Sequence, residues 1–443
     1  MQRDAIDFGK MSIGRLFFRL FVPTFLGLLF GALFNVADGI FVGRGVGSDA
    51  LAAVNIAAPV YMLFTGLALM FGAGVSVVAA IHLSKDNDKA ACICITQALT
   101  VSVTLGAVML LVIEVWPEQV SRLFGGSARL EPMVVDYLRY VAGGLLGCLV
   151  MMVGMFVIRL DGSPRYAMLT NIVPAVLNIF LDWLFVFPLQ WGIKGAAFAT
   201  SISEVLGMGM VLFYIFFKGN RLHLYKPKFS HTAISLTLRN VGYMARMGLP
   251  TLLGELALTC MMVVGNYAFI SHLGEDGVAA FSVACYLMPL VFMFGNGIAQ
   301  SLLPIVSYNH GLGDEGRIQA TLRVSLATAV GCGVGISLLV AIMSHMVAQL
   351  FLGNAMVPLE LCEQGLPLFA AGFLFMTLNL VLIGYEQSLE HAKAATAYML
   401  LRGFVLIVAC FLLLPMLLGD DGLWLAMPAS ELMTLLIITL ARR

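Results

Sequence analysis

Charged residues are scarce in this sequence: only 11% of its 443 residues are Asp, Glu, Lys or Arg, whereas 60% are hydrophobic. Soluble globular domains carry about 25% charged residues, so this scarcity argues against a soluble protein. The formal net charge is zero, which gives no reason to expect a nucleic-acid partner. The composition instead indicates a polytopic membrane protein with the lipid bilayer as its main surrounding.

The usual signatures of catalysis and metal binding are also lacking. No G-x-x-x-x-G-K-[ST] phosphate loop occurs, and the seven histidines include no H-E-x-x-H spacing. The stretch ACICI at 91–95 holds a C-x-C pair without a second pair to complete a zinc site or a disulfide framework. We therefore expect neither an enzyme nor a protein with a resident cofactor.

Long apolar runs recur from one end of the sequence to the other. Each is roughly 20 residues or longer, enough to cross a hydrocarbon core of about 30 Å. The runs are continuous rather than alternating, so helices are favoured over a barrel. The prediction is an all-α membrane protein with twelve transmembrane segments, at about 14–42, 50–82, 91–116, 133–158, 165–188, 192–217, 241–271, 277–308, 318–345, 362–387, 393–415 and 421–441.

Basic residues alternate between the connections and predict the orientation. The start, MQRDAIDFGKMSIGR, has mixed charge and does not resemble a secretory signal. Lys and Arg gather before the first segment, after every even-numbered segment and at the end of the sequence, which predicts that both termini are cytoplasmic. The richest connection, GNRLHLYKPKFSHTAISLTLRN, is interpreted as a linker that lies on an anionic leaflet. We expect a multi-pass protein of the plasma (inner) membrane.

The two halves of the sequence repeat with an offset of 227 residues. Pro23-Thr24 corresponds to Pro250-Thr251, and Ser203-Glu204 corresponds to Ser430-Glu431. The repeat predicts two pseudo-symmetric six-helix bundles, 1–218 and 241–443, joined by a cytoplasmic linker at 219–240. Duplicated six-helix halves are typical of transporters whose substrate path runs between them, although duplication alone does not exclude a channel or a membrane enzyme.

Three long strings carry a resemblance to a known family: VPTFLGLLFGALFNVADGIFVGRGVGSDALAAVNIAAPV, RLDGSPRYAMLTNIVPAVLNIFLDWLFVFPLQWGIKGAAFAT and GNGIAQSLLPIVSYNHGLGD. They closely resemble the MATE (multidrug and toxic compound extrusion) family, near its prokaryotic DNA-damage-inducible and staphylococcal multidrug-efflux branches. The resemblance implies the MATE fold and antiport of cationic, amphipathic drugs against H⁺ or Na⁺. Matched to the family's site in the first bundle, it implies coupling residues Asp38, Asn178, Asp182 and Thr200, with Pro23 at a bend in helix 1.

The positions of these residues support one site independently of the family. Asp38, Asp182 and Thr200 each lie five or six residues from an outer helix end, or about 8–9 Å below it. Asn178 shares a helix face with Asp182, and Asn35 shares one with Asp38. Buried carboxylates in a membrane cost about 2.5–3.5 kcal/mol or more each. The candidate roles are a proton site, a Na⁺ site at Asp38, Asn178, Asp182 and Thr200, or only hydrogen bonding between helices.

Other ionisable residues in apolar segments are candidates for the substrate cavity. These are Glu204, Glu255 and Glu431, of which the repeat-related Glu204 and Glu431 could alternatively brace the bundles. Arg402 is expected to pair with Glu386. The C-lobe sodium site of some relatives is not carried over, because Glu255 follows Pro250 too closely to match and no aspartate lies on the tenth segment.

The function predicted from the sequence is secondary active antiport, in which cationic or amphipathic drugs or metabolites leave in exchange for H⁺ or Na⁺. The alternative is a flippase for a lipid-linked precursor of the same superfamily. Such flippases tend to have buried Arg and Lys in their cavity, and this sequence has few. The expected partners are small organic cations, and the protein is expected to act as a monomer.

Overall fold

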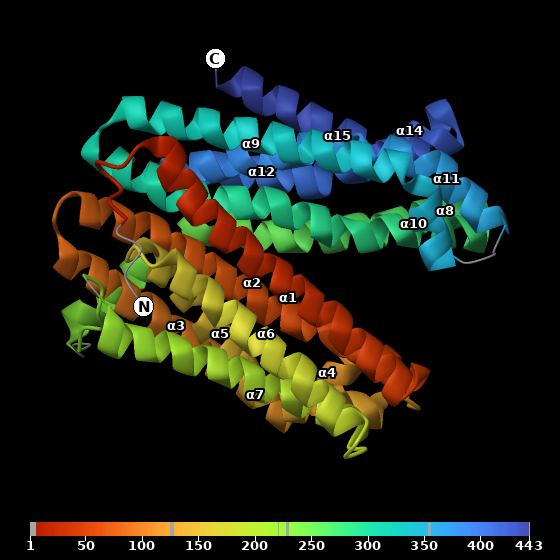
Figure 1. Ribbon diagram of the computed structural model, residues 1–443, viewed down its shortest axis with the longest axis horizontal. Coiled ribbons are helices and arrows are strands. Elements are labelled where there is room, and N and C mark those ends of the chain that lie inside the picture. The colour runs from red at the N-terminus through yellow and green to blue at the C-terminus, as the bar shows by residue number, and fades with distance from the viewer. Residues whose placement is uncertain (1–5, 125–127, 220, 227–229, 353–355, 443) are drawn as a thin grey trace. The chain divides into compact units, whose positions relative to one another are not determined.

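The computed structural model describes residues 6–124, 128–219, 221–226, 230–352 and 356–442, and over these residues it is helical with no β-strand (Figure 1). The chain divides into two compact units. The N-terminal unit comprises Met1–Met11 and Phe18–Gly248, and the C-terminal unit comprises Ser12–Phe17 and Leu249–Arg443.

The helices of the N-terminal unit come first in the chain. They are α1 (Ile13–Gly45), α2 (Ser48–Ser84), α3 (Asp88–Val115), α4 (Pro117–Leu123), α5 (Glu131–Leu160), α6 (Pro164–Val186), α7 (Gly192–Phe213), the π-helical turn η1 (Tyr214–Lys218) and the first part of α8 (His231–Leu312). The middle of this unit is formed by α2 and α5, since 83% of the apolar window of each is buried.

The helices of the C-terminal unit repeat this order, beginning within α8. They are residues 249–312 of α8, then α9 (Glu315–Ile342), α10 (Ser344–Leu352), α11 (Met356–Ala370), α12 (Gly372–Ser388), α13 (Ala392–Leu400), the π-helical segment η2 (Leu401–Leu406), α14 (Ile407–Leu418) and α15 (Asp420–Ala441).

The predicted helical segments agree with the structure once one break is recognised. Eleven helical spans among the described residues are long and apolar enough to cross a membrane, and one of them runs from Thr232 to Leu312. That span is two helices joined at Gly274, whose φ of 66° and ψ of −156° are not helical and suit a residue without a Cβ. The predicted twelve segments therefore correspond to the observed helices.

Two short helices were not predicted. The seven-residue α4 and the nine-residue α10 are too short to span a bilayer and were therefore not recognised as segments. They begin at Pro117 and Ser344, which differ by the same 227 residues as the rest of the repeat. The duplication thus includes these connections as well as the spanning helices.

Close packing of α5 against α7 fixes the rotation of both helices. Gly144, Gly147 and Gly154 of α5 face Ser201, Glu204 and Val211 of α7, and a Cβ on any of the three glycines would clash with its facing residue. Each pair is separated by the same number of residues, so the two helices run in the same direction. Small residues allow this close approach in membrane helices, and here they hold Glu204 against α5.

The connection between the two halves is tied to the N-terminal unit where it is described. The backbone N–H groups of Arg221 and Leu222 donate to Asp161 Oδ1, and the Arg221 side chain forms ion pairs with Asp86 and Asp88. Helix α8 begins at His231, ten residues before the predicted segment. Ser230 accepts a hydrogen bond from the Ala233 N–H, an N-cap that starts the helix early.

Candidate functional site

The four polar residues predicted as a coupling site all lie in the N-terminal unit. Asp38 is on α1, Asn178 and Asp182 are on α6, and Thr200 is on α7. All four are buried, with relative exposures of 9% for Asp38, 3% for Thr200 and 0% for the other two. The first helix of the unit and the consecutive helices α6 and α7 therefore contribute buried polar groups.

The two carboxyl groups are in contact. Asp38 and Asp182 lie within range of a side-chain hydrogen bond to each other. Such a bond between two carboxyls needs a proton, because ionised carboxylates only accept. Beside them, Asn178 Nδ2 donates to Thr200 Oγ1 at 3.4 Å, and Thr200 Oγ1 donates to the Ala196 carbonyl oxygen at 3.2 Å.

This site has more acceptors than donors. Both carboxyl oxygens of Asp182, Oδ1 of Asp38 and Oδ1 of Asn178 are buried, and no other described group donates to them. Buried polar atoms are normally hydrogen-bonded, and a carboxylate without a counter-charge is costly. The oxygen-rich arrangement therefore suits a proton or a hard monovalent cation. The described residues contain no group of three His, Cys, Asp or Glu that would hold a transition metal.

The depths of these residues are more scattered than the count made from the sequence. Asp38 lies seven residues before the end of α1, Asp182 four before the end of α6, and Thr200 eight after the start of α7. At 1.5 Å per residue these offsets are about 10, 6 and 12 Å, compared with the expected 8–9 Å. The depth of a residue along its helix does not by itself bring two side chains into contact. Contact between Asp38 and Asp182 also depends on the rotation of α1 and α6 about their axes.

Tyr137 of α5 is part of the site and was missed from the sequence. It lies close enough to interact electrostatically with both Asp38 and Asp182. Tyr137 is six residues after the start of α5, which places it at a similar depth of about 9 Å. Its distance from the helix start could have indicated that Tyr137 lies at the depth of the aspartates, but tyrosine is too common in apolar helices to be noticed.

Two further predicted residues belong to α1. The side chain of Asn35 lies outside the described residues, so its predicted role stays a prediction. Pro23 lies inside α1, fifteen residues before Asp38, and the helix continues on both sides of it. Proline removes one backbone donor from the helix at this point.

The first cavity candidate, Glu204, lies in the interior of the N-terminal unit. It is 6% exposed and accepts a hydrogen bond from the Tyr61 hydroxyl at 2.9 Å. Cys148 Sγ in turn donates to the Tyr61 oxygen at 3.7 Å. The second acid, Glu255 on α8, is partly exposed and forms no hydrogen bond or ion pair with a described residue.

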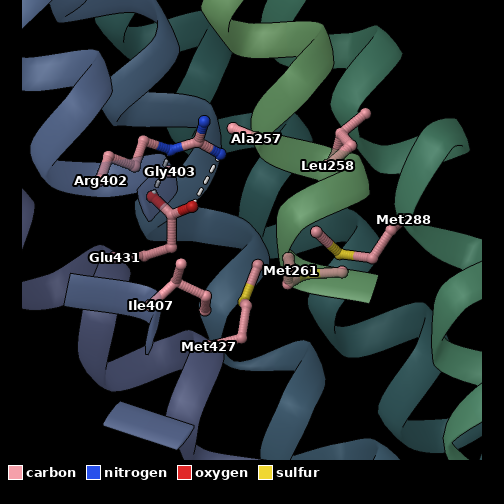
Figure 2. Close-up of a pocket in the computed structure, with 9 residues that line it drawn as sticks. All are labelled: Ala257, Leu258, Met261, Met288, Arg402, Gly403, Ile407, Met427 and Glu431. Carbon is pink, nitrogen blue, oxygen red and sulfur yellow. Dashed lines mark hydrogen bonds and ion pairs between the residues drawn. The ribbon is translucent and has the colours of Figure 1, made fainter. Parts of the chain in front are cut away.

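The third cavity candidate, Glu431, is held in a buried ion pair with Arg402 (Figure 2). The pair is bidentate, with Arg402 Nη2 at 2.7 Å from Oε1 and Arg402 Nε at 2.9 Å from Oε2. Asn379 Nδ2 also donates to Oε2 at 2.7 Å. The pair lines a cavity of about 20 Å³, whose other walls include Met261, Met288 and Met427. This space fits about one water molecule.

The expected pairing of Arg402 with Glu386 was wrong. Glu386 instead contacts His391 Nδ1 at 2.8 Å and Arg442 Nε at 3.1 Å. The reason is depth: Arg402 lies ten residues into the helix that begins at Ala392, whereas Glu386 is two residues from the end of α12. The two positions differ by about 12 Å along the helix axes. Glu431, ten residues before the end of α15, lies at the depth of Arg402.

Comparison with known families gives two matches along the chain. The family model MatE matches residues 23–184 and again residues 250–412. The matches begin at positions that differ by 227 residues, so each half of the chain corresponds to one copy of the family repeat. Together they cover more than half of the chain.

Individual relatives agree with this assignment. The chain is 22% identical over 454 aligned positions to the multidrug export protein MepA of Staphylococcus aureus strain MRSA252, covering 98% of this chain and 95% of the relative. It is 25% identical to the FAD transporter of Shewanella oneidensis, covering 73% of this chain and 71% of that protein. A solved structure of a multidrug resistance MATE family transporter of the MOP superfamily, in an outward-facing conformation, has the same fold with a TM-score of 0.90, 23% identity and coverage of 98% and 95%. The chain belongs to the MATE family of multi-pass membrane transporters.

Proposed function

We propose that this transporter is a secondary active antiporter, which exports cationic or amphipathic small molecules in exchange for H⁺ or Na⁺. The observation that carries the proposal is the pair Asp38 and Asp182, buried in contact with each other and with oxygens that no described donor satisfies. Two adjacent carboxylates in a membrane-embedded site repel each other and are poorly solvated. A bound proton or cation removes both penalties.

The coupling ion acts on the contact between α1 and α6 in this proposal. A proton lets the carboxyls of Asp38 and Asp182 bond to each other, whereas Na⁺ would be held by oxygens of Asp38, Asp182, Asn178 and Thr200. In either case the ion converts repulsion between two helices into attraction. When it leaves, α1 and α6 separate, and α1 bends most easily near Pro23, where one backbone hydrogen bond is missing.

The cargo proposed here is an organic cation, because the deprotonated aspartates provide negative charge for it. The name of one relative specifies multidrug export and that of another specifies FAD, which carries negative phosphates, so FAD is the competing cargo. A lipid-linked precursor flippase has less support, since of the two buried arginines among the described residues, Arg402 is neutralised by Glu431 and Arg159 lies one residue before the end of α5. We further propose a monomer in the plasma membrane with both termini in the cytoplasm, as the distribution of Lys and Arg predicts.

Transport into proteoliposomes tests this proposal. Ethidium or FAD is supplied under a proton gradient, a Na⁺ gradient or neither, and uptake is compared for wild type, Asp38→Asn and Asp182→Asn. We expect ion-driven ethidium uptake to fall at least tenfold in both variants. Asp136→Asn is the control, because Asp136 lies on α5 but pairs with Lys194 at 3.3 Å near the surface. Ion-driven uptake at the wild-type rate in Asp38→Asn would contradict the proposal, and uptake of FAD alone would overturn the cargo.

A further inference from the structure

The repeat places one acid at the same position in each unit, and the two acids have different surroundings. Glu204 on α7 and Glu431 on α15 are 227 positions apart, and both are almost fully buried, at 6% and 5% exposure. Glu431 receives two bonds from Arg402 and one from Asn379, so its negative charge is compensated.

Glu204 lacks this compensation. The Tyr61 hydroxyl of α2 donates to Oε1 at 2.9 Å, and the Cys148 thiol of α5 lies within hydrogen-bonding range of both Tyr61 and the Glu204 carboxyl; both of these groups are neutral. The other oxygen, Oε2, is buried and receives no bond from a described donor. Besides α2, which supplies Tyr61, the helices packed against α7 are α5 and α6, with η1 at its end, and the described residues of these elements place no Lys, Arg or His against this carboxyl.

A neutral carboxyl group fits these surroundings better than a carboxylate. Burial of an unpaired charge is expensive, whereas a protonated carboxyl has no charge and supplies a donor of its own. The Tyr61 hydroxyl satisfies one oxygen, and the proton would reside on the oxygen that no group satisfies. A second carboxyl that must hold a proton to remain buried is thus present outside the aspartate pair.

Its place on α7 connects it with the coupling site. Thr200, which accepts from Asn178, lies four residues before Glu204 and therefore on the same face of the helix, one turn away. The backbone at Glu204 also contacts Gly147 so closely that α5 and α7 cannot shift there without changing the position of this acid. A movement that alters the aspartate site would therefore alter the surroundings of Glu204.

We propose that Glu204 is a second proton-carrying carboxyl of the N-terminal unit. It gains one proton from one side of the membrane and releases one proton to the other in each cycle, in addition to the ion exchanged at the aspartates. This inference rests on the proposed antiport function, and it assigns part of the coupling to protons. Glu431, with its arginine, has no such role.

Proton release on substrate binding tests this assignment. The purified full-length protein in detergent is titrated with ethidium in weakly buffered solution that contains a pH indicator dye. Protons released per bound ethidium are counted for wild type, Glu204→Gln, Glu204→Asp and Asp38→Asn. The exposed Glu360 gives the control variant Glu360→Gln. We expect Glu204→Gln to release one proton fewer than wild type, and Glu204→Asp to restore that proton with a shifted pH profile.

The outcomes separate the two proposals. Equal release by wild type and Glu204→Gln, with a deficit only in Asp38→Asn, would overturn the role of Glu204 and leave the aspartate site intact. A deficit only in Glu204→Gln would retain this inference and contradict the role of the aspartates. If Glu204→Gln fails to fold, wild-type release with an unchanged pH profile in Glu204→Asp would overturn the inference, and a shifted profile would support it. Absence of any release from wild type would also overturn it.

Discussion

The buried pair of Arg402 and Glu431 allows a quantitative prediction for the variant Arg402→Met. Methionine has a similar length and removes three interactions of the guanidinium, two to Glu431 and one to Met399 Sδ at 3.7 Å. The side chains of the pair are only 4% and 6% exposed, and the cavity beside them has room for about one water molecule, so bulk water cannot replace the lost bonds. The remaining donor from Asn379 is neutral and leaves the charge of Glu431 uncompensated. Breaking a buried pair in this way costs about 3–5 kcal/mol.

The assay is thermal and denaturant-induced unfolding of purified protein in detergent. We expect Arg402→Met to lose about 3–5 kcal/mol, and the double variant Arg402→Met with Glu431→Leu to recover most of it, because a pair of apolar side chains removes the unpaired charge. Arg122→Met is the control, since its ion pair with Glu131 lies at the surface and its loss should have little effect. Arg402→Met with wild-type stability would refute the reasoning, as would a double variant less stable than the single one.

Two further predictions concern packing and the connection between the halves. Gly248→Ala should destabilise the N-terminal unit by about 1–3 kcal/mol, because its Cβ would overlap the Met70 carbonyl. Thermal unfolding measures this change. Gly242→Ala on the same helix meets no atom within 4 Å and should stabilise by about 0.5–1 kcal/mol through helix propensity. An equal change in stability for both variants would show that helix propensity, and not the clash with Met70, determines the effect of Gly248→Ala. Asp161→Ala removes the acceptor of two backbone N–H groups in the connection, so limited proteolysis should cut residues 219–226 faster. Glu360→Ala, at an exposed acid of the C-terminal unit, should be cut at the wild-type rate, and unchanged cleavage of Asp161→Ala would contradict the assigned role.

Most of the helices could be predicted because lipid leaves few alternatives. A chain that crosses a hydrocarbon layer must satisfy its backbone within each segment, so length and hydropathy alone locate the spanning helices. Short helices such as α4 and α10 cannot be located in this way, because seven or nine residues are too few to span the hydrocarbon layer. The early start of α8 could not be located in this way either, because the Ser230 cap lies in polar sequence where hydropathy gives no signal.

The sequence predicted only those residues of the candidate site whose type is unusual in an apolar helix. Asp38 and Asp182 stand out because acids are rare in apolar helices. Tyr137, Tyr61 and Cys148 do not stand out, and their positions beside acids depend on helix rotation that no single segment encodes. The wrong partner for Arg402 shows the same limit: a nearby acid in sequence was chosen, whereas helix depth decides the contact.

The repeat itself explains why coupling is assigned to one unit. The positions in the second half that correspond to Asp38, Asn178, Asp182 and Thr200 are Gly265, Val405, Ala409 and Met427, none of which can bind a proton or a cation through oxygen side chains. Among the buried acids of the first unit, Glu204 does have a buried acidic counterpart, Glu431, and there an arginine compensates its charge. Duplication therefore preserved the helices while the polar chemistry diverged. Under the proposed antiport, this division confines the titratable groups, which weaken a bundle when they are left charged, to the unit in which α1 bends.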